Sequence, residues 1–144
     1  MHFSIEIVRK IPLAYSAMCR PLCRELELPQ TAFDILMFLG NNPDYKTASE
    51  IVEIRRFKAN LVSGNIDRLV QEGYLLRRPV AGDRRKTELL CTPKALPVIR
   101  RGQAMQAAFF EALFAGMEEP ARAAFFRALQ QMETNLDTLL TEEA

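Results

Sequence analysis

The stretch between Thr47 and Thr92 limits the possible folds more than any other part of this chain. It opens with Thr47-Ala48-Ser49-Glu50, in which the threonine hydroxyl can accept from the backbone N–H three residues on while the glutamate reaches back. This capping-box spacing predicts a short helix that runs to about Ile54, followed by a turn at residues 55–57.

A longer helix is expected over residues 58–72. Val62, Ile66 and Leu69 recur at spacings of four and three, which predicts that they form one inward-facing stripe. Gly73 follows directly, and glycine ends many helices because it adopts the left-handed conformation without steric cost.

Two strands are expected next, over residues 74–80 and 87–91, joined by the basic loop Ala81-Gly82-Asp83-Arg84-Arg85-Lys86. A short helix, a turn, a second helix and a two-stranded hairpin form the winged helix-turn-helix arrangement. Its second helix can enter the major groove of DNA. The sequence therefore predicts a DNA-binding lobe of this kind.

Helices are also expected before this stretch. Residues 5–26 have a helical pattern that Pro12 and Pro21 interrupt, and a kink or break is expected near Pro21. A second helix should open at Pro29-Gln30 and stop at the breaker residues 40–43. Its expected inner face consists of Phe33, Leu36, Met37 and Leu39.

Two more helices should follow the hairpin, so the fold class is mainly α with one small β-hairpin. Thr92-Pro93 predicts the start of a helix that reaches about Phe114, and the last helix should follow a turn at residues 116–120. Helices at both chain ends carry more apolar residues than one small lobe can cover. A dimer interface is therefore expected over about 3–26 and 118–140, burying on the order of 2,000 Å² or more.

The net charge of +1 conceals an uneven distribution. Residues 55–101 carry 12 basic and 4 acidic side chains, net +8, whereas residues 1–54 are net −2 and residues 102–144 net −5. A basic centre between acidic ends indicates a surface for a polyanion, and it coincides with the predicted DNA-binding lobe.

On the helix over residues 58–72, the side opposite the apolar stripe is polar. Asparagine can bind adenine through two hydrogen bonds, serine can bind base edges or phosphates, and glycine lets the backbone approach DNA. Asp67 is not expected to contact DNA, because phosphates repel a carboxylate. The DNA-binding residues expected on this helix are Lys58, Asn60, Ser63, Gly64, Asn65 and Arg68.

The hairpin supplies the second part of the expected interface. Arg84, Arg85 and Lys86 at its tip can reach phosphates or the narrow minor groove. Arg77 and Arg78 at its base can reach phosphates. The alternative interpretation is a solvated basic turn.

These residues resemble the MarR family, the multiple-antibiotic-resistance type of regulator. Asp83, Arg85 and Thr92 fit the family's wing motif, which has the form D-x-R, then a strand, then L-T opening a helix. Residues 61–75 are similar to the family's recognition helix, and residues 118–140 resemble its C-terminal helix.

The resemblance implies a homodimeric transcriptional regulator with a single domain over residues 1–144. Residues 28–94 would be the DNA-binding lobe, and residues 1–27 and 95–144 the helical dimerisation region. Asp83 would orient Arg85 through a charge-assisted pair instead of touching DNA. A small-molecule effector would bind between the dimer interface and the lobes and relieve repression at a roughly palindromic duplex site.

Cys19 and Cys23 are four residues apart and share one helix face. Some MarR-type regulators sense oxidants through a cysteine in the N-terminal region, so a redox-sensing regulator is an alternative. We favour a structural role, because no sequence neighbour acts as a base that would lower a thiol pKa. Three cysteines, an odd number, do not make a disulfide framework.

Other functions have little support in the sequence. His2 is the only histidine, and we find no metal-ligand cluster, phosphate-binding loop or paired nucleophile, so no metal, cofactor or enzyme activity is expected. A winged helix that binds protein instead of DNA is the alternative, although the net charge of +8 argues against it. Without a signal-peptide pattern or an apolar run of membrane-spanning length, the chain is expected in the cytoplasm.

Overall fold

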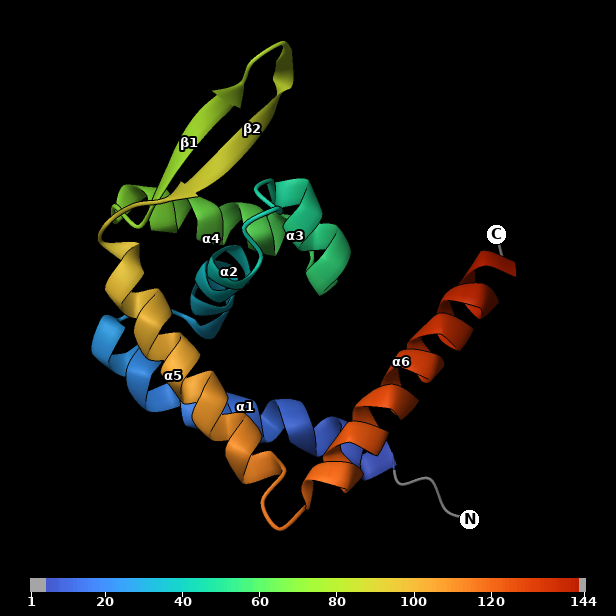
Figure 1. Ribbon diagram of the computed structural model, residues 1–144. Helices are drawn as coiled ribbons and strands as arrows, with labels where there is room; N and C mark the ends of the chain where they lie inside the picture. Colours follow the sequence, from blue (N-terminus) through green and yellow to red (C-terminus); the bar gives the residue numbers. More distant parts are fainter. Residues whose placement is uncertain (1–4, 143–144) are drawn as a thin grey trace. The chain divides into compact units, whose positions relative to one another are not determined.

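The computed structural model describes residues 5–142, apart from the side chains of Ile5 and Arg84. The chain divides into two compact units, residues 1–109 and 110–144. The mainly helical fold with one hairpin confirms the predicted fold class, whereas the domain boundaries implied by the resemblance stay a prediction. The described elements are α1 (Ile5–Leu26), α2 (Gln30–Asn41), α3 (Ala48–Arg55), α4 (Ala59–Gln71), β1 (Leu75–Val80), β2 (Asp83–Cys91), α5 (Ala95–Leu113) and α6 (Glu119–Glu142) (Figure 1).

The core of the first unit is built around α2, which lies against α4 and α1 (Figure 1). The predicted inner face of α2 is confirmed, and the burial extends further around the helix than the sequence pattern indicates. The helix ends where the backbone N–H of Asn42 donates to the carbonyl oxygen of Phe38 at 2.9 Å. Its buried residues are Ala32, Phe33, Ile35, Leu36, Met37, Phe38 and Leu39.

A glycine allows α5 to approach α2 closely. Gly102 is buried, and a Cβ atom added to it would lie 2.3 Å from the sulfur of Met37 and 3.0 Å from the ring of Phe33. Since real Cβ atoms do not come so near to another heavy atom, any larger residue at position 102 would displace Met37.

The helix-turn-helix follows the sequence prediction closely. Thr47 and Glu50 form the expected capping box, with the Thr47 hydroxyl accepting from the Glu50 N–H at 3.2 Å and the Glu50 carboxylate accepting from the Thr47 N–H at 3.1 Å. On α4, the predicted stripe Val62, Ile66 and Leu69 is buried. These local signals place α4 correctly to within one residue at each end.

The hairpin differs from its predicted form, because β2 begins at Asp83 and the loop is only Ala81-Gly82. The two strands pair in register as far as Pro79 opposite Thr87, after which Val80 lies opposite Asp83 and residues 84–86 have no partner. Proline has no N–H for the ladder, so the regular pairing ends there and the bulge follows. The basic tip therefore belongs to the second strand.

The break expected near Pro21 is absent, and α1 is one helix from Ile5 to Leu26. A proline inside a helix removes the hydrogen bond to the carbonyl four residues earlier. Cys19 and Cys23, on either side of Pro21, are both buried in the core. The packing of this face offsets the loss of one hydrogen bond.

The start of α5 also differs from the prediction, since the helix begins at Ala95. The hydroxyl of Thr92 donates to the carbonyl oxygen of Gly73 at 2.6 Å. The ammonium group of Lys94 donates to the carbonyl oxygen of Glu72, also at 2.6 Å. The segment that leads into α5 thus holds the C-terminal end of α4.

The second unit consists of the last residues of α5, a turn and α6. Gly116 has a positive φ of 83° in the turn. The rings of Phe114, Phe125 and Phe126 pack on one another with centroids 5.3–5.7 Å apart, and Arg122 donates to the carbonyl oxygen of Phe114 at 3.1 Å. No described residue of α6 is buried. In residues 5–142, no helix is long and apolar enough to cross a membrane.

Candidate nucleic-acid interface

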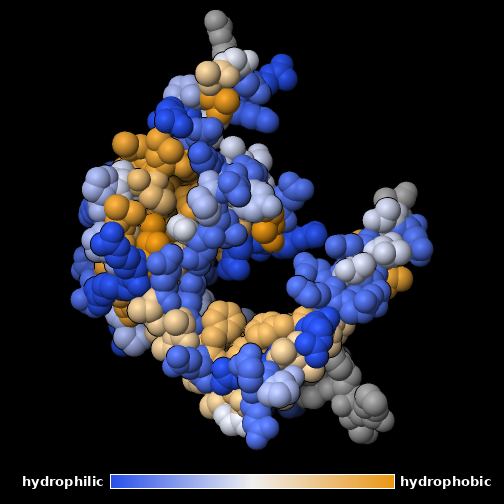
Figure 2. All heavy atoms as spheres, in the orientation of Figure 1, coloured by the Kyte–Doolittle hydropathy of each residue, from blue (hydrophilic) through white to orange (hydrophobic). Residues whose placement is uncertain are grey.

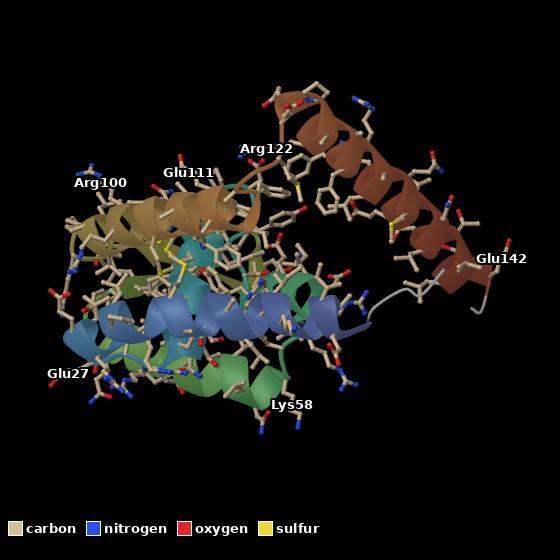
Figure 3. The ribbon with its side chains drawn as sticks, turned by 90° about the horizontal axis from the view of Figure 1, so that it is seen from below. Glu27, Lys58, Arg100, Glu111, Arg122 and Glu142 are labelled. Carbon is tan, nitrogen blue, oxygen red and sulfur yellow. The ribbon has the colours of Figure 1, made fainter. Side chains whose placement is uncertain are left out.

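Helix α4 presents a polar face to solvent, opposite its buried stripe. Asn60, Ser63, Gly64 and Arg68 are exposed on it, and Asn65 is half-buried at its side. Lys58 is the residue before the helix, and Figure 3 shows its side chain pointing away from the body of the first unit. Of the six residues predicted for this helix, four thus lie on its solvent-facing side, Asn65 lies at the edge of that side, and Lys58 lies just before the helix.

Most hydrogen-bonding groups on this face are available to a ligand. Within the described part of the chain, no hydrogen bond or ion pair engages the side chain of Lys58 or Ser63. Asn60 accepts through its oxygen from a backbone N–H at 3.0 Å, so both of its amide donors are free, whereas Asn65 donates to the carbonyl oxygen of Leu61 at 2.8 Å. Asn60 is therefore better placed than Asn65 to read a base.

Sequence reasoning missed Leu61, which is 46% exposed beside the polar face. An apolar side chain on a recognition helix can contact the methyl group of thymine. The sequence did contain a signal for this exposed position. Leu61 is apolar but does not share the spacing of the buried stripe, which predicts that it faces solvent.

An ion pair joins α4 to the base of the hairpin. The guanidinium of Arg77 on β1 is bound to the carboxylate of Asp67 on α4. Both side chains are exposed, so the pair contributes little to stability, but it fixes the direction of each. Arg77, expected to contact phosphate, therefore has a partner within the chain, and Asp67 has a role that its charge alone did not indicate.

Two other arginines expected at the interface are also paired. Arg68 donates to the carbonyl oxygen of Glu27 at 2.8 Å and lies 3.4 Å from the carboxylate of Glu72. Arg78 donates to the carboxylate of Glu88, directly opposite on β2, at 2.7 Å, and this hydrogen bond holds the pKa of Glu88 below its usual range. These arginines keep more than two-fifths of their side chains exposed, so phosphates can still reach them.

The tip of the hairpin carries Arg85 and Lys86, both exposed. Asp83 accepts a hydrogen bond from the backbone N–H of Arg85 at 2.9 Å, whereas no ion pair between these two side chains is found among the described residues. The contact seen is thus an Asx turn and not the expected charge-assisted pair. The side chain of Arg84 lies outside the described part.

The base of the hairpin also buries apolar residues against the rest of the first unit. Leu75 and Leu89 are buried, and the backbone N–H of Leu89 donates to the carbonyl oxygen of Lys46 at 2.7 Å. Figure 2 shows hydrophobic residues gathered where the hairpin meets the start of α5. The hairpin is therefore anchored at its base, while Arg85 and Lys86 near its tip are exposed.

The cysteine pair lies in the core and not at a reactive surface. Burial raises the pKa of the Cys19 thiol to about 11, although a hydrogen bond with Tyr15 lowers it in part. Burial also raises the pKa of Cys23. Both thiols are therefore protonated at neutral pH, which disfavours attack on an oxidant. His2 lies outside the described residues, and residues 5–142 contain no group of three or more metal-ligating side chains.

Residues 26–86, from the end of α1 to the tip of the hairpin, match the family model described as MarR family. No curated protein matches the chain.

Solved structures share the fold along almost the whole chain. A MarR-family transcriptional regulator from Listeria monocytogenes, complexed with a 26mer DNA, is 16% identical with a TM-score of 0.83, over 100% of this chain and 97% of that one. The transcriptional regulator PA3341 is 25% identical with a TM-score of 0.81, over 92% and 97%. BpsR of Bordetella bronchiseptica, whose DNA binding is regulated by 6-hydroxynicotinic acid, is 20% identical with a TM-score of 0.70, over 89% and 96%.

Proposed function

We propose that this chain is a sequence-specific, duplex-DNA-binding transcriptional regulator of the MarR type that acts as a homodimer, because residues 26–86 match the MarR-family model and the fold is shared with MarR-family regulators. The observation that carries the proposal is the solvent-facing surface of α4 beside a basic hairpin. The Listeria monocytogenes regulator with the same fold was solved with DNA, which supports the same partner for this chain.

The two parts of this surface have different tasks. Asn60, Ser63 and Leu61 on α4 carry neutral groups that can distinguish bases in the major groove. Arg85 and Lys86 on the hairpin, with Arg84, supply mainly attraction to phosphates, which is independent of sequence. Gly64 allows the α4 backbone to come close to the DNA, because no atom lies within 4 Å of the place where its Cβ would be.

Dimerisation would cover the apolar residues that the chain leaves exposed. On α1, Ile7, Val8 and Leu13 are 55–69% exposed. On α6, Leu136 and Leu139 are 55% and 58% exposed, and neighbouring turns carry further large apolar residues. A single chain that exposes so much apolar surface gains stability by burying it against a second copy.

The regulator acts in the cytoplasm, as a repressor that a small ligand releases from a roughly palindromic site. The relative BpsR, regulated by 6-hydroxynicotinic acid, supports control by a small molecule. The two-fold symmetry of a dimer supports the palindrome, with half-sites about 10–10.5 base pairs apart.

Selection of bound fragments from random duplex DNA tests this function directly. The expected result is one enriched palindromic motif, bound more tightly than a scrambled duplex at the same salt concentration, by a species with the mass of a dimer. Equal binding to both duplexes would reject sequence-specific regulation. The absence of salt-dependent DNA binding would favour a winged helix that binds protein.

A pair of arginine variants tests the role of the hairpin. Arg85→Ala should weaken binding to the selected and the scrambled duplex by a similar factor and lower the salt slope by about one. Arg100→Ala is the matched control, because it makes the same change of charge on α5, outside α4 and the basic tip of the hairpin, and Figure 3 shows Arg100 pointing outward. Equal effects of the two variants would mean that Arg85 acts only through net charge.

Asp83→Ala tests the turn at the hairpin tip. Removing the acceptor for the Arg85 N–H should weaken DNA binding, although the change also removes a negative charge. Tighter binding by this variant would show that Asp83 has no orienting role.

A further inference from the structure

A hollow of about 560 Å³ opens in the first unit among α1, α2, α3 and α5. Its volume lies within the range of sites for small organic ligands, roughly 300–1,000 Å³. Rings and apolar side chains make up much of the wall, including those of Tyr15, Met37, Phe38 and Phe109. A ligand that fits this wall must itself be largely apolar.

Most polar side chains of this hollow already form hydrogen bonds within the protein. The amide of Gln106 donates to the hydroxyl of Tyr15 at 2.9 Å and accepts from the amide of Asn41 at 3.0 Å. The amide of Asn42 donates to the carbonyl oxygen of Phe38 at 2.9 Å. These groups do not need hydrogen-bonding partners on a ligand, because their hydrogen bonds are already made within the protein.

Asp34 is the exception among the polar residues of the wall. Its side chain is only 12% exposed, and its nearest cation is Arg55, with 3.9 Å between the guanidinium nitrogen and the carboxylate oxygen. Arg55 is itself 42% exposed and lies over the ring of Phe57 at 4.9 Å. Since a carboxylate has about four acceptor positions, one distant guanidinium and the amide of Gln30 leave it under-compensated.

The protonation of Asp34 reflects the same shortage of partners. Burial raises its pKa from 3.8 to about 6, and Arg55 and Gln30 lower it only in part. At neutral pH the group is still a buried anion, which is costly unless a cation pairs with it.

We propose that this hollow binds a small amphipathic amine, whose ammonium group pairs with Asp34 while its apolar part lies against the rings of the wall. An ammonium group supplies the positive charge and the donors that Asp34 lacks, and the rings of Tyr15 and Phe38 offer a cation a favourable surface. An anionic ligand would instead be repelled by Asp34 and would have to bind Arg55.

Occupation of the site would act on the DNA-binding surface through Arg55, and this step rests on the proposed function. Arg55 is the last residue of α3, and Arg56, with a φ of 57°, begins the turn that leads to α4. An ammonium group at Asp34 releases Arg55 from the contact that ties the end of α3 to α2. The turn before the recognition helix then loses one of its supports.

Three probes that share one ring system and differ in charge test the ligand class. Titration calorimetry of the full-length protein at pH 7.5 should show 1-naphthylmethylamine binding at least tenfold more tightly than 1-naphthylmethanol, and 1-naphthoate binding most weakly. Tighter binding of 1-naphthoate, or equal binding of all three, would overturn the proposal.

Two variants locate the charge that is recognised. Asp34→Asn keeps the shape of the side chain and should abolish the preference for the amine while leaving the affinity for the alcohol unchanged. Arg55→Gln should strengthen binding of the amine, since it removes the competing cation. An unchanged preference in Asp34→Asn would overturn the proposal.

A pH titration of the wild-type protein supplies the same test if Asp34→Asn does not fold. The groups that face Asp34 are Arg55 from α3 and Tyr15, Cys19 and Cys23 from α1, and burial raises the pKa of each of the last three. Between pH 7.5 and 5, only Asp34 among these changes charge. Affinity for the amine should fall about tenfold over this range, and affinity for the alcohol should not; parallel changes would reject the role of Asp34.

A DNA-binding measurement separates this inference from the function on which its last step rests. Saturating amine should weaken binding to the selected duplex at least tenfold in the wild type and not in Asp34→Asn. Amine binding without an effect on the duplex would overturn the coupling through Arg55. If the protein selected no duplex at all, the proposed function would fail, while the calorimetric result would still decide the ligand class.

Discussion

Helices α2 and α6 are both rich in apolar residues, but those of α2 are mostly buried and those of α6 are not. Seven of the 12 residues of α2 are buried by the rest of the first unit. None of the described residues in the 24-residue helix α6 is buried, although its large apolar side chains recur along its whole length. The core of the lobe is complete within one chain, whereas α6 has a surface of the kind that a second chain completes.

The spacing of the exposed residues on α6 shows what kind of partner it suits. They recur at steps of four and three over four turns, which is the seam of a helix that packs lengthwise on other helices. On α2, by contrast, apolar residues are consecutive, as expected for a helix surrounded by its own chain. The exposed seam consists of Phe125, Leu129, Met132, Leu136 and Leu139.

The largest effect is expected on the α2 side of this comparison. Phe33→Ala removes a fully buried ring next to Gly102 and should lower the free energy of unfolding by about 3–5 kcal/mol. Urea denaturation followed by circular dichroism measures this, with Phe33→Leu as the milder control. A loss of less than about 1 kcal/mol would mean that the lobe does not depend on this core.

On α6, Leu136→Ala should weaken self-association and leave the lobe folded. Full burial of a leucine contributes about 1.5–3 kcal/mol, so each copy of the dimer loses an amount of that order. Sedimentation over a range of concentrations measures the dissociation constant. Thr138→Ala, on the same helix, is the control, since Thr138 donates only to the carbonyl oxygen of Thr134. A monomeric wild-type protein at micromolar concentration would contradict the proposed dimer.

The buried carboxylate on α2 should make stability depend on pH in a way that α6 does not. Burial holds the pKa of Asp34 at about 6, above its ordinary 3.8, so the folded state binds the proton more tightly. The contribution of this group to stability therefore rises as the pH falls through 6, is complete below about 4, and amounts to roughly 3 kcal/mol.

This rise should be missing in Asp34→Asn, which should also be more stable than the wild type at pH 7.5. Glu25→Gln is a control of opposite sign, because hydrogen bonds from Arg101 lower the pKa of Glu25 and any stability they supply is lost in acid. Urea denaturation at several pH values between 4 and 8 measures all three proteins. A wild type and an Asp34→Asn variant with parallel pH profiles would contradict the assignment.

The smallest effect concerns Gly64, which is exposed like the residues of α6 but is proposed to face DNA and not a second chain. Ala has a higher helix propensity than Gly, and there is room for its methyl group, so Gly64→Ala should raise the free energy of unfolding by about 0.5–1 kcal/mol. If α4 lies in the major groove, the same methyl group should weaken DNA binding. A variant that gains stability and keeps full DNA affinity would show that DNA does not approach this point.

The features predicted correctly from sequence are those encoded by near neighbours. The capping box of Thr47 and Glu50, the stripe of Val62, Ile66 and Leu69 and the stop at Gly73 each depend on residues a turn apart. The early start of β2 was missed because residues 83–86 are charged and were assigned to the loop. The irregular pairing after Pro79 depends on the opposite strand, which the local pattern does not reveal.

The candidate site was predicted in outline, and the assignment of its residues to DNA contacts stays a prediction. Sequence placed the polar residues of α4 on one side and the basic residues on a hairpin. It did not reveal that Arg77 is bound to Asp67, because that pair depends on the twist of the hairpin over α4. Nor did it single out Asp34, because the burial of its carboxylate and its distance from Arg55 depend on the packing of helices that are far apart in the sequence.

The hydrogen bonds from Thr92 and Lys94 fix the C-terminal end of α4, so a small tilt of the helix moves its N-terminal end the most. A helix of 13 residues is about 20 Å long, so a rotation of roughly 3° about this end moves the opposite end by roughly 1 Å. Asn60 lies at that opposite end. A base-reading hydrogen bond does not survive a displacement larger than about 1 Å. A tilt too small to disturb the core is therefore enough to change which DNA sequence the helix can read.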